Sequence, residues 1–168
     1  MGRDKKNEAR TEHFAKLVRS MMETDAWRAL PTAAQALYPW LRLEWHGPTS
    51  NNNGQIRLSV RQAAKLMGCN MKTAARAFHD LQKKGFIVVT EGARLGLSGE
   101  AKSPALELTE IELRHSKNSG GRRLYKEWKV GHDFPVCVAS ANNPTGRNGK
   151  KTCADKGNTV VPISGTRR

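Results

Sequence analysis

The chain is poor in cysteine, in aromatic side chains and in long apolar runs. Its three cysteines, Cys69, Cys137 and Cys153, are odd in number and widely spaced, which favours neither a disulfide framework nor a zinc site. Aromatic residues make up 6% of the chain, so we expect a core of modest size. No run of about 18 apolar residues and no signal peptide stands out. We therefore expect a cytoplasmic protein that does not bind membranes.

Acidic residues are also scarce, with 15 against 29 basic residues and a net charge of +14. The excess is uneven, because residues 56–90 carry +6, residues 91–113 carry −3 and residues 114–168 carry +9. Concentrated positive charge predicts a polyanionic partner. The 168 residues are enough for one compact domain of about 100 residues with flexible ends.

The residue patterns of an active site are missing as well. The five histidines fall at no metal-ligand spacing, and no nucleophile stands near a base and an orienting acid. The segment Gly146–Thr152 departs from a phosphate-binding loop in its glycine spacing and in its second lysine. We expect neither an enzyme nor a bound cofactor or metal.

Two helices joined by a tight turn are the most specific pattern present. Ser59 and Gln62 form a capping box that begins the first helix, and Gly68 is placed to end it in a left-handed conformation. Asn70 then caps a second helix that ends before Gly85. The first helix presents an apolar face of Ala63, Ala64, Leu66 and Met67. The second buries Ala74, Ala77, Phe78 and Leu81 and turns Lys72, Arg76, His79 and Lys83 outward.

Short segments of strand character surround this helix pair. Gln55–Leu58, Phe86–Thr90 and Ala105–Leu108 predict a small sheet, with alternating burial in the last strand. The segment Gly92–Pro104 is too long and Gly-rich for a tight hairpin and is typical of a wing. The sequence thus predicts a winged helix-turn-helix.

The flanking segments predict less regular structure. Phe14–Val18 is either a short strand or a helical turn. Ser20 is expected to cap a helix that runs to Leu30. Thr32 is expected to cap a second helix that runs to about Trp45 and is interrupted by Pro39. In the latter helix the residues expected to face inward are Leu37, Trp40, Leu41 and Ala33 or Ala34. The Asn-rich segment 47–54 is expected to be a mobile connector, with phosphate contact as the alternative. Residues 124–129 form a helical turn or dock their aromatic side chains, and residues 133–136 are a last anchored piece.

The helix pair and its strands resemble a known family of DNA-binding domains. The pattern comprises Leu58, Ser59, Ala63, Ala64, Gly68, Asn70, Thr73, Arg76, Leu81 and Lys84–Ile87. It is similar to small bacterial winged-helix regulators of the multiple-antibiotic-resistance and gluconate-repressor types, over about one third of the chain. Upstream, residues 26–30 and 33–38 resemble short helix-turn-helix proteins of bacteria, phages and plasmids, some of them similar to replication initiators.

The resemblance implies an α+β fold and a double-stranded DNA partner. Residues 14–113 would form the winged helix-turn-helix with an N-terminal helical extension, residues 1–13 a flexible arm, and residues 114–168 a largely disordered basic tail. The second helix would enter the major groove. The expected DNA-binding residues are Arg61, Lys65, Asn70, Met71, Lys72, Thr73, Arg76, His79, Lys83, Arg94, Lys102, Arg122 and Arg123.

Several alternatives stay open at this point. Asn70 is foremost a helix cap, Arg76 reads a guanine or holds a phosphate, and the tail grips phosphates or only solubilises the chain. The favoured role is a transcriptional regulator associated with the bacterial nucleoid; the others are a replication initiator of a mobile element, and an adaptor for protein or RNA. No heptad marks a dimer interface, so a homodimer is left open.

Overall fold

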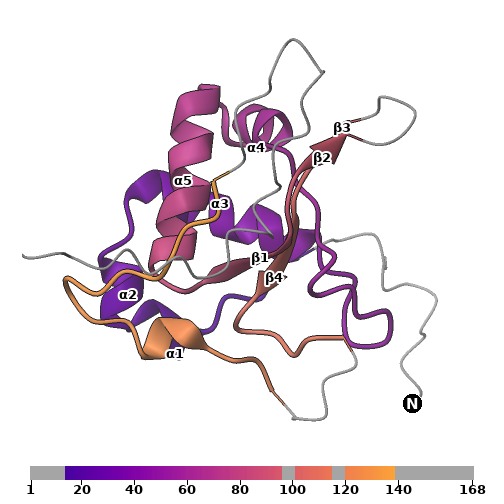
Figure 1. The fold of residues 1–168 in the computed structure, drawn as a ribbon. Helices are drawn as coiled ribbons and strands as arrows, with labels where there is room; N and C mark the ends of the chain where they lie inside the picture. Colours follow the sequence, from indigo (N-terminus) through magenta and orange to yellow (C-terminus); the bar gives the residue numbers. More distant parts are fainter. Residues whose placement is uncertain (1–13, 96–100, 115–119, 139–168) are drawn as a thin grey trace, which may run out of the picture.

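The computed structural model describes residues 14–95, 101–114 and 120–138, and these fold as α+β. The helices are α1 (Arg19–Met22), α2 (Asp25–Arg28), α3 (Thr32–Leu43), α4 (Val60–Met67) and α5 (Met71–Lys83). The strands are β1 (Ile87–Glu91), β2 (Arg94–Leu95), β3 (Ala101–Lys102) and β4 (Ala105–Leu108), followed by a 3-10 helix, η1 (Leu124–Lys126). The helices gather beside a long hairpin (Figure 1). The predicted arm at residues 1–13 and the tail beyond residue 138 lie outside the described residues.

The first helical segment is divided into two single turns at Thr24. The Thr24 hydroxyl donates to the Met21 carbonyl at 2.7 Å and accepts from the Trp27 amide at 3.3 Å, so it closes α1 and caps α2. The prediction of one helix capped by Ser20 is therefore wrong. Phe14–Val18 forms neither the strand nor the helical turn expected there.

Helix α3 differs from its prediction at both ends and in the middle. Pro31 precedes it and no side chain caps it, so Thr32 is its first helical residue and not its cap. The helix ends at Leu43, before Trp45, and it continues through Pro39 where an interruption was expected.

The core is built around α3 and a cluster of aromatic rings. The buried residues of α3 are Ala34, Leu37, Tyr38 and Leu41. Trp40, expected inward, is only partly buried, and Tyr38 takes the fully buried position. The rings of Trp27, Tyr38 and Phe86 contact one another edge to face, with centroids 5.5 to 5.7 Å apart. These contacts join α2, α3 and the residue before β1.

The predicted helix pair is confirmed closely. Ser59 and Gln62 cap α4 reciprocally, Gly68 ends it with φ of 63°, and the Asn70 side chain caps α5. The inward stripe of α5 is buried as expected, comprising Ala74, Ala77, Phe78 and Leu81. Leu66 is an exception to the predicted apolar face, since it is 40% exposed.

The sheet is smaller than predicted, and its hairpin is longer. β1 pairs antiparallel with β4, with Ile87 opposite Leu108, and a bulge separates Val89 from Glu91. β2 and β3 continue the same hairpin outward. Residues 55–58 contribute only one bridge, between Ile56 and Leu106, and not a strand.

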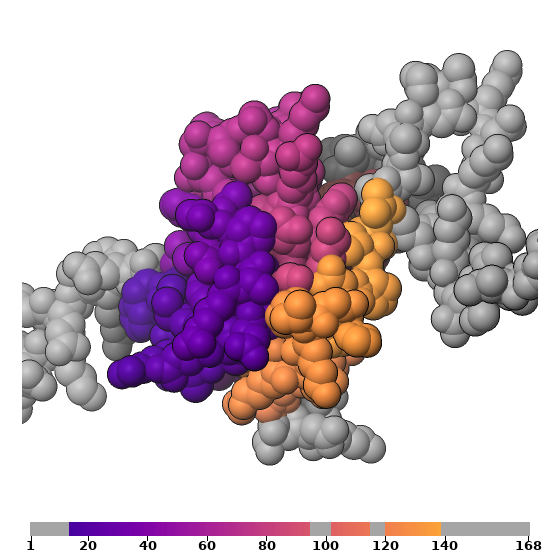
Figure 2. All heavy atoms as spheres, turned by 90° about the vertical axis from the view of Figure 1, so that its left-hand side faces the viewer, coloured from indigo at the N-terminus to yellow at the C-terminus, as the bar shows by residue number. Residues whose placement is uncertain are grey.

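The expected tail includes a segment that packs on the domain. Residues 120–138, which we call the C-terminal strap, lie against both the N-terminal helices and the β1 region (Figure 2). Tyr125 and Trp128 are buried, and the Tyr125 ring stacks on Phe86 with centroids 4.9 Å apart. The docking of aromatic side chains from this segment is thus confirmed, and the structured region extends well past Leu113. A Cβ at Gly121 would lie 2.4 Å from the backbone of the turn after β4, so glycine permits this close crossing.

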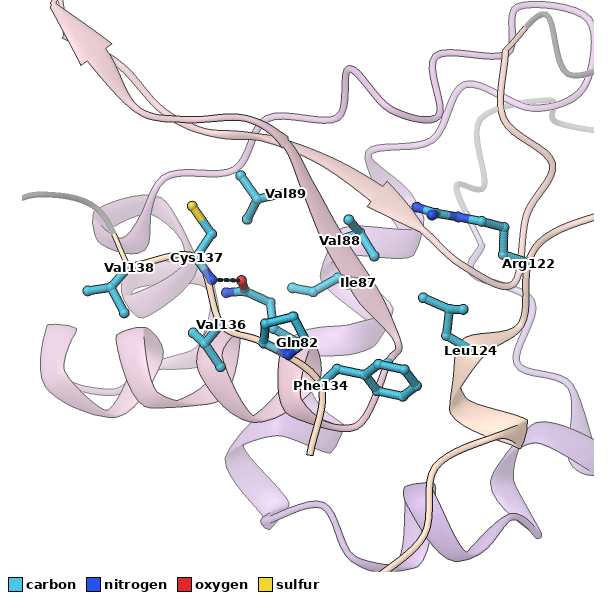
Figure 3. Close-up of a pocket in the computed structure, with 12 residues that line it drawn as sticks. Gln82, Ile87, Val88, Val89, Arg122, Leu124, Phe134, Val136, Cys137 and Val138 are labelled. Atoms are coloured by element: carbon cyan, nitrogen blue, oxygen red, sulfur yellow. Dashed lines mark hydrogen bonds between the residues drawn. The ribbon is translucent and has the colours of Figure 1, made fainter. Parts of the chain in front are cut away.

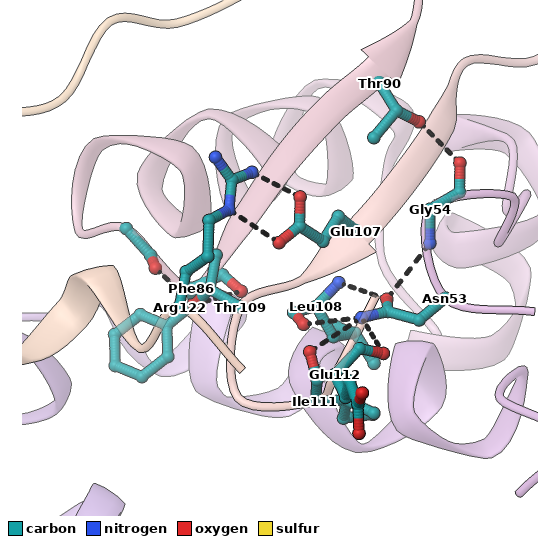
Figure 4. Close-up of polar contacts among 11 residues, drawn as sticks. Asn53, Gly54, Phe86, Thr90, Glu107, Leu108, Thr109, Ile111, Glu112 and Arg122 are labelled. Carbon is teal, nitrogen blue, oxygen red and sulfur yellow. Dashed lines mark hydrogen bonds and ion pairs between the residues drawn. The ribbon is translucent and has the colours of Figure 1, made fainter. Parts of the chain in front are cut away.

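The strap also explains why β4 is buried on both faces instead of alternating. Glu107 is 1% exposed, and the Arg122 guanidinium donates to both of its carboxylate oxygens (Figure 4). A charge at such a position requires a paired partner, and Arg122 supplies it.

The Asn-rich loop is a structural joint and not a free connector. Asn53 is 1% exposed; its side chain donates to the carbonyls of Leu108 and Ile111 and accepts from the Leu108 amide (Figure 4). Asn51 accepts from the indole of Trp45, and Asn52 donates to the carbonyl of Glu44. The asparagines therefore satisfy backbone groups at the end of β4 and at the end of α3.

Candidate nucleic-acid interface

The corner between α4 and α5 determines which side chains reach solvent. The Gly68 and Cys69 amides donate to carbonyls of the last turn of α4, and α5 begins at Met71, three residues after Gly68. The two helices pack on each other and on α3 through small residues such as Ala63, Ala74 and Ala77, all fully buried. This close packing leaves the opposite side of α5 open along its first two turns.

Four basic side chains are exposed on these two helices. Lys72 and Arg76 are exposed on α5 and lie one turn apart, while Arg61 and Lys65 are exposed and one turn apart on α4. None of the four makes an ion pair with another residue in the described ranges. We call these four residues the basic face. At its edge, Met71 is 56% exposed at the start of α5.

The other expected residues of α5 are less available. The side-chain oxygen of Asn70 accepts from the Thr73 amide at 2.8 Å, so Asn70 acts as a cap, and Thr73 is half-buried. His79 is half-buried, and Lys83 lies 4.0 Å from Asp80 in the third turn. The exposed basic side chains of α5 that have no described ion pair therefore lie near its N-terminus.

The hairpin contributes one paired and one unpaired cation. Arg94 donates to Glu91 at 2.8 Å, whereas Lys102 is exposed. Arg57 also pairs with Glu91 and donates to the Ser103 carbonyl. Arg57 was not among the predicted site residues, because its position in the sequence does not indicate which residue it pairs with across the hairpin.

The two arginines of the strap lie away from the basic face. The strap meets α5 at its C-terminal end, where the Phe134 amide donates to the Lys83 carbonyl at 2.9 Å. Arg122 is committed to Glu107, and this hydrogen bond raises the pKa of Arg122 above its ordinary value. Arg123 is exposed, with a left-handed φ of 51°. Arg122 therefore has a structural role, and its expected contact with phosphate stays a prediction.

A groove of about 600 Å³ lies between the strap and β1 (Figure 3). Its walls are mainly apolar and include Val88, Leu124 and Val136, with Arg122 at one end. Gln82, also in the wall, is engaged, since its side chain accepts from the Cys137 amide and donates to the Phe78 carbonyl. The groove adjoins the C-terminal end of α5, and the basic face belongs to α4 and the first half of α5.

No group of three or more histidine, cysteine, aspartate or glutamate side chains is placed to hold a metal ion within the described part of the chain. No helix in that part has the length and apolar character needed to cross a bilayer. No family model, curated protein or solved structure matches the chain.

Proposed function

We propose that residues 55–108 form a winged helix-turn-helix that binds double-stranded DNA, with α5 in the major groove. The arrangement supporting this is α4, a three-residue turn, α5 and a two-stranded hairpin whose outer end extends on the same side as α4 (Figure 1). An α-helix fits the major groove of B-DNA, and residues near its N-terminus reach the base edges in this geometry.

The observation that carries the proposal is the basic face. Exposed cations elsewhere on the described surface are in several cases neutralised, as Arg94 is by Glu91 at 2.8 Å and Arg19 by Glu23 at 2.7 Å. Arg61, Lys65, Lys72 and Arg76 are exposed on two helices that pack on each other, without a described counter-ion. Four uncompensated charges on neighbouring helices attract a polyanion, and DNA phosphates provide it at regular spacing.

Different parts of this surface would make different contacts. Arg61 and Lys65 on α4 would hold phosphates, which fixes the position of the domain without reading sequence. Arg76 would donate to a guanine or to a phosphate, and Met71 would offer an apolar contact to a thymine methyl group. If α5 recognises a specific DNA sequence in this way, the protein would serve as a transcriptional regulator.

The test is selection from a randomised duplex DNA pool, with Arg76→Ala and Arg28→Ala as paired variants. Arg28 is an exposed arginine on α2 without an ion pair in the described ranges, so its removal changes the net charge equally. We expect the wild type and Arg28→Ala to select one common motif. Arg76→Ala should lose about 1–3 kcal/mol of discrimination at one base pair if Arg76 reads a guanine.

Other results would redirect the proposal. Identical selection by wild type and both variants, with no enriched motif, would remove α5 as a reading helix. Competition by duplex RNA as strong as that by DNA would favour the adaptor role. Repeated selected motifs in an AT-rich origin would favour replication initiation, whereas a single palindrome beside a promoter would favour regulation.

A further inference from the structure

Two arginines share one acidic partner at the point in the hairpin where β1 ends and β2 follows. We call this part of the hairpin the hairpin base. Glu91 is the last residue of β1, and its carboxylate pairs with Arg94 at 2.8 Å and also with Arg57. The Arg57 guanidinium donates in addition to the Ser103 carbonyl, so two of its donor groups are used within the protein. The bulge between Val89 and Glu91 is the kind of distortion that redirects a side chain, and it brings Glu91 opposite Ala105.

We infer that Glu91 limits the affinity of the protein for DNA of any sequence, because it keeps Arg57 and Arg94 from contacting phosphates. This inference rests on the proposed function. The cluster is accessible, because the side chains of Arg57, Glu91 and Arg94 are 32%, 36% and 57% exposed. Without Glu91, the hairpin base would present two uncompensated arginines, and with it the three groups carry a net charge of +1.

The consequence follows from how phosphate contacts act. They add affinity for every sequence alike, so each one raises binding to random DNA as much as binding to a target. An acidic residue that occupies two guanidinium groups lowers this uniform component. The sequence-dependent component comes from the N-terminal half of α5, where Lys72, Arg76 and Met71 are exposed.

The test is the affinity of Glu91→Gln for a random-sequence 30-base-pair duplex across a potassium chloride series. The variant should bind more tightly than wild type, with a steeper salt dependence. One added phosphate contact makes the affinity ratio of variant to wild type shrink by about 3.5-fold between 0.05 and 0.2 M salt. Glu127→Gln is the matched control, since Glu127 is exposed on the strap, makes no ion pair with a described residue, and loses the same charge. It should bind as wild type does.

A double-mutant cycle distinguishes two causes of tighter binding by Glu91→Gln, namely the release of Arg57 and Arg94 from their ion pairs and a change in the fold. Arg94→Ala should alter binding little in the wild-type background, where Glu91 occupies Arg94, and should weaken it clearly in the Glu91→Gln background. Circular dichroism and the melting temperature of each variant would verify that the domain is intact.

The outcomes distinguish this inference from the proposed function. Wild-type protein that binds no duplex DNA would overturn both. The role of Glu91 alone would be overturned by a different result. In that case the wild type binds DNA and Arg76→Ala loses the selected motif, but Glu91→Gln has the same affinity and salt dependence as the wild type. Weaker binding by Glu91→Gln would also overturn it, because Glu91 would then be orienting the arginines onto DNA.

Discussion

The Tyr38 hydroxyl donates a 2.8 Å hydrogen bond to a carboxylate oxygen of Glu110, which joins the middle of α3 to the turn after β4. The Arg42 Nε atom lies 3.6 Å from the same oxygen, and all three side chains are largely buried. Burial and then the charge of Glu110 raise the pKa of Tyr38 well above its ordinary value of 10.0. The group is therefore held neutral in the folded protein.

Replacing Tyr38 by Phe should change how stability depends on alkaline pH. A raised folded pKa gives stability that is present below the unfolded pKa and is lost as pH rises through the folded pKa, so wild-type stability should fall above about pH 10. At pH 8, Tyr38→Phe should cost about 1 kcal/mol through the lost hydrogen bond. Urea unfolding of both proteins at pH 8 and 10.5 measures the gap, which should narrow at the higher pH; a constant gap would contradict the assignment.

Asn53→Asp should destabilise the domain although it preserves the shape of the side chain. The amide nitrogen donates to the buried carbonyls of Leu108 and Ile111 at 3.0 and 2.9 Å, and also to that of Glu112 at 3.2 Å, and an aspartate has no such donor. Two buried carbonyls without donors should cost about 2–4 kcal/mol in the free energy of unfolding. Asn52→Asp is the comparison, because Asn52 is half-buried and donates to one carbonyl. Equal urea midpoints for the two variants would count against the joint formed by Asn53.

Arg122→Ala should unfold more easily because it leaves the Glu107 carboxylate buried without its partner. We expect a loss of about 3 kcal/mol, at the low end for a broken buried pair, since water reaches Arg122, whose side chain is 47% exposed. Adding Glu107→Gln should restore part of the loss. The neighbouring Arg123→Ala should change stability by less than about 0.5 kcal/mol, as its side chain is exposed. Chemical denaturation that ranks Arg123→Ala with Arg122→Ala would refute the pairing.

The junction of the strap with α5 should weaken in acid. The Asp133 carboxylate accepts from Lys84 at 2.8 Å and from the Trp128 indole at 2.9 Å, and these hydrogen bonds lower the pKa of Asp133 below its ordinary 3.8. A depressed folded pKa gives stability that is present above the unfolded pKa and is lost as pH falls through the folded pKa. Melting temperatures of wild type and Asp133→Asn should therefore differ at pH 6, and the difference should shrink as the pH falls below about 3.9, the unfolded pKa of aspartate. A difference that persists unchanged in acid would exclude this titration.

The sequence predicts well those features of the fold that depend on residues close to one another in the chain. The caps at Ser59 and Asn70, the left-handed Gly68 and the periodic stripe of α5 all depend on neighbours within four positions, and each is confirmed. Ala105–Leu108 is likewise the strand predicted. Failures follow where the deciding partner is distant in the chain.

The C-terminal strap illustrates that limit. Arg122 and Glu107 are 15 residues apart, and Tyr125 stacks on a phenylalanine before β1, so no local period announces either contact. The charge excess of residues 114–168 pointed to a solvated tail, although one of its arginines neutralises a buried carboxylate. Of the candidate interface, the residues of α4 and α5 were predictable from helix periodicity, but the occupation of Arg57 and Arg94 by Glu91 was not.

Phe86 lies between ring partners from both directions of the chain, with Trp27 and Tyr38 before it and Tyr125 after it. During synthesis the N-terminal partners leave the ribosome first, and the ring stays uncovered on one face until Tyr125 has emerged. The helix pair is thus translated well before the core that supports it is complete. A nascent chain halted shortly after β4 would expose an aromatic surface and be a substrate for chaperones or proteases, while one that has released residue 138 would contain every contact of the folded domain described above.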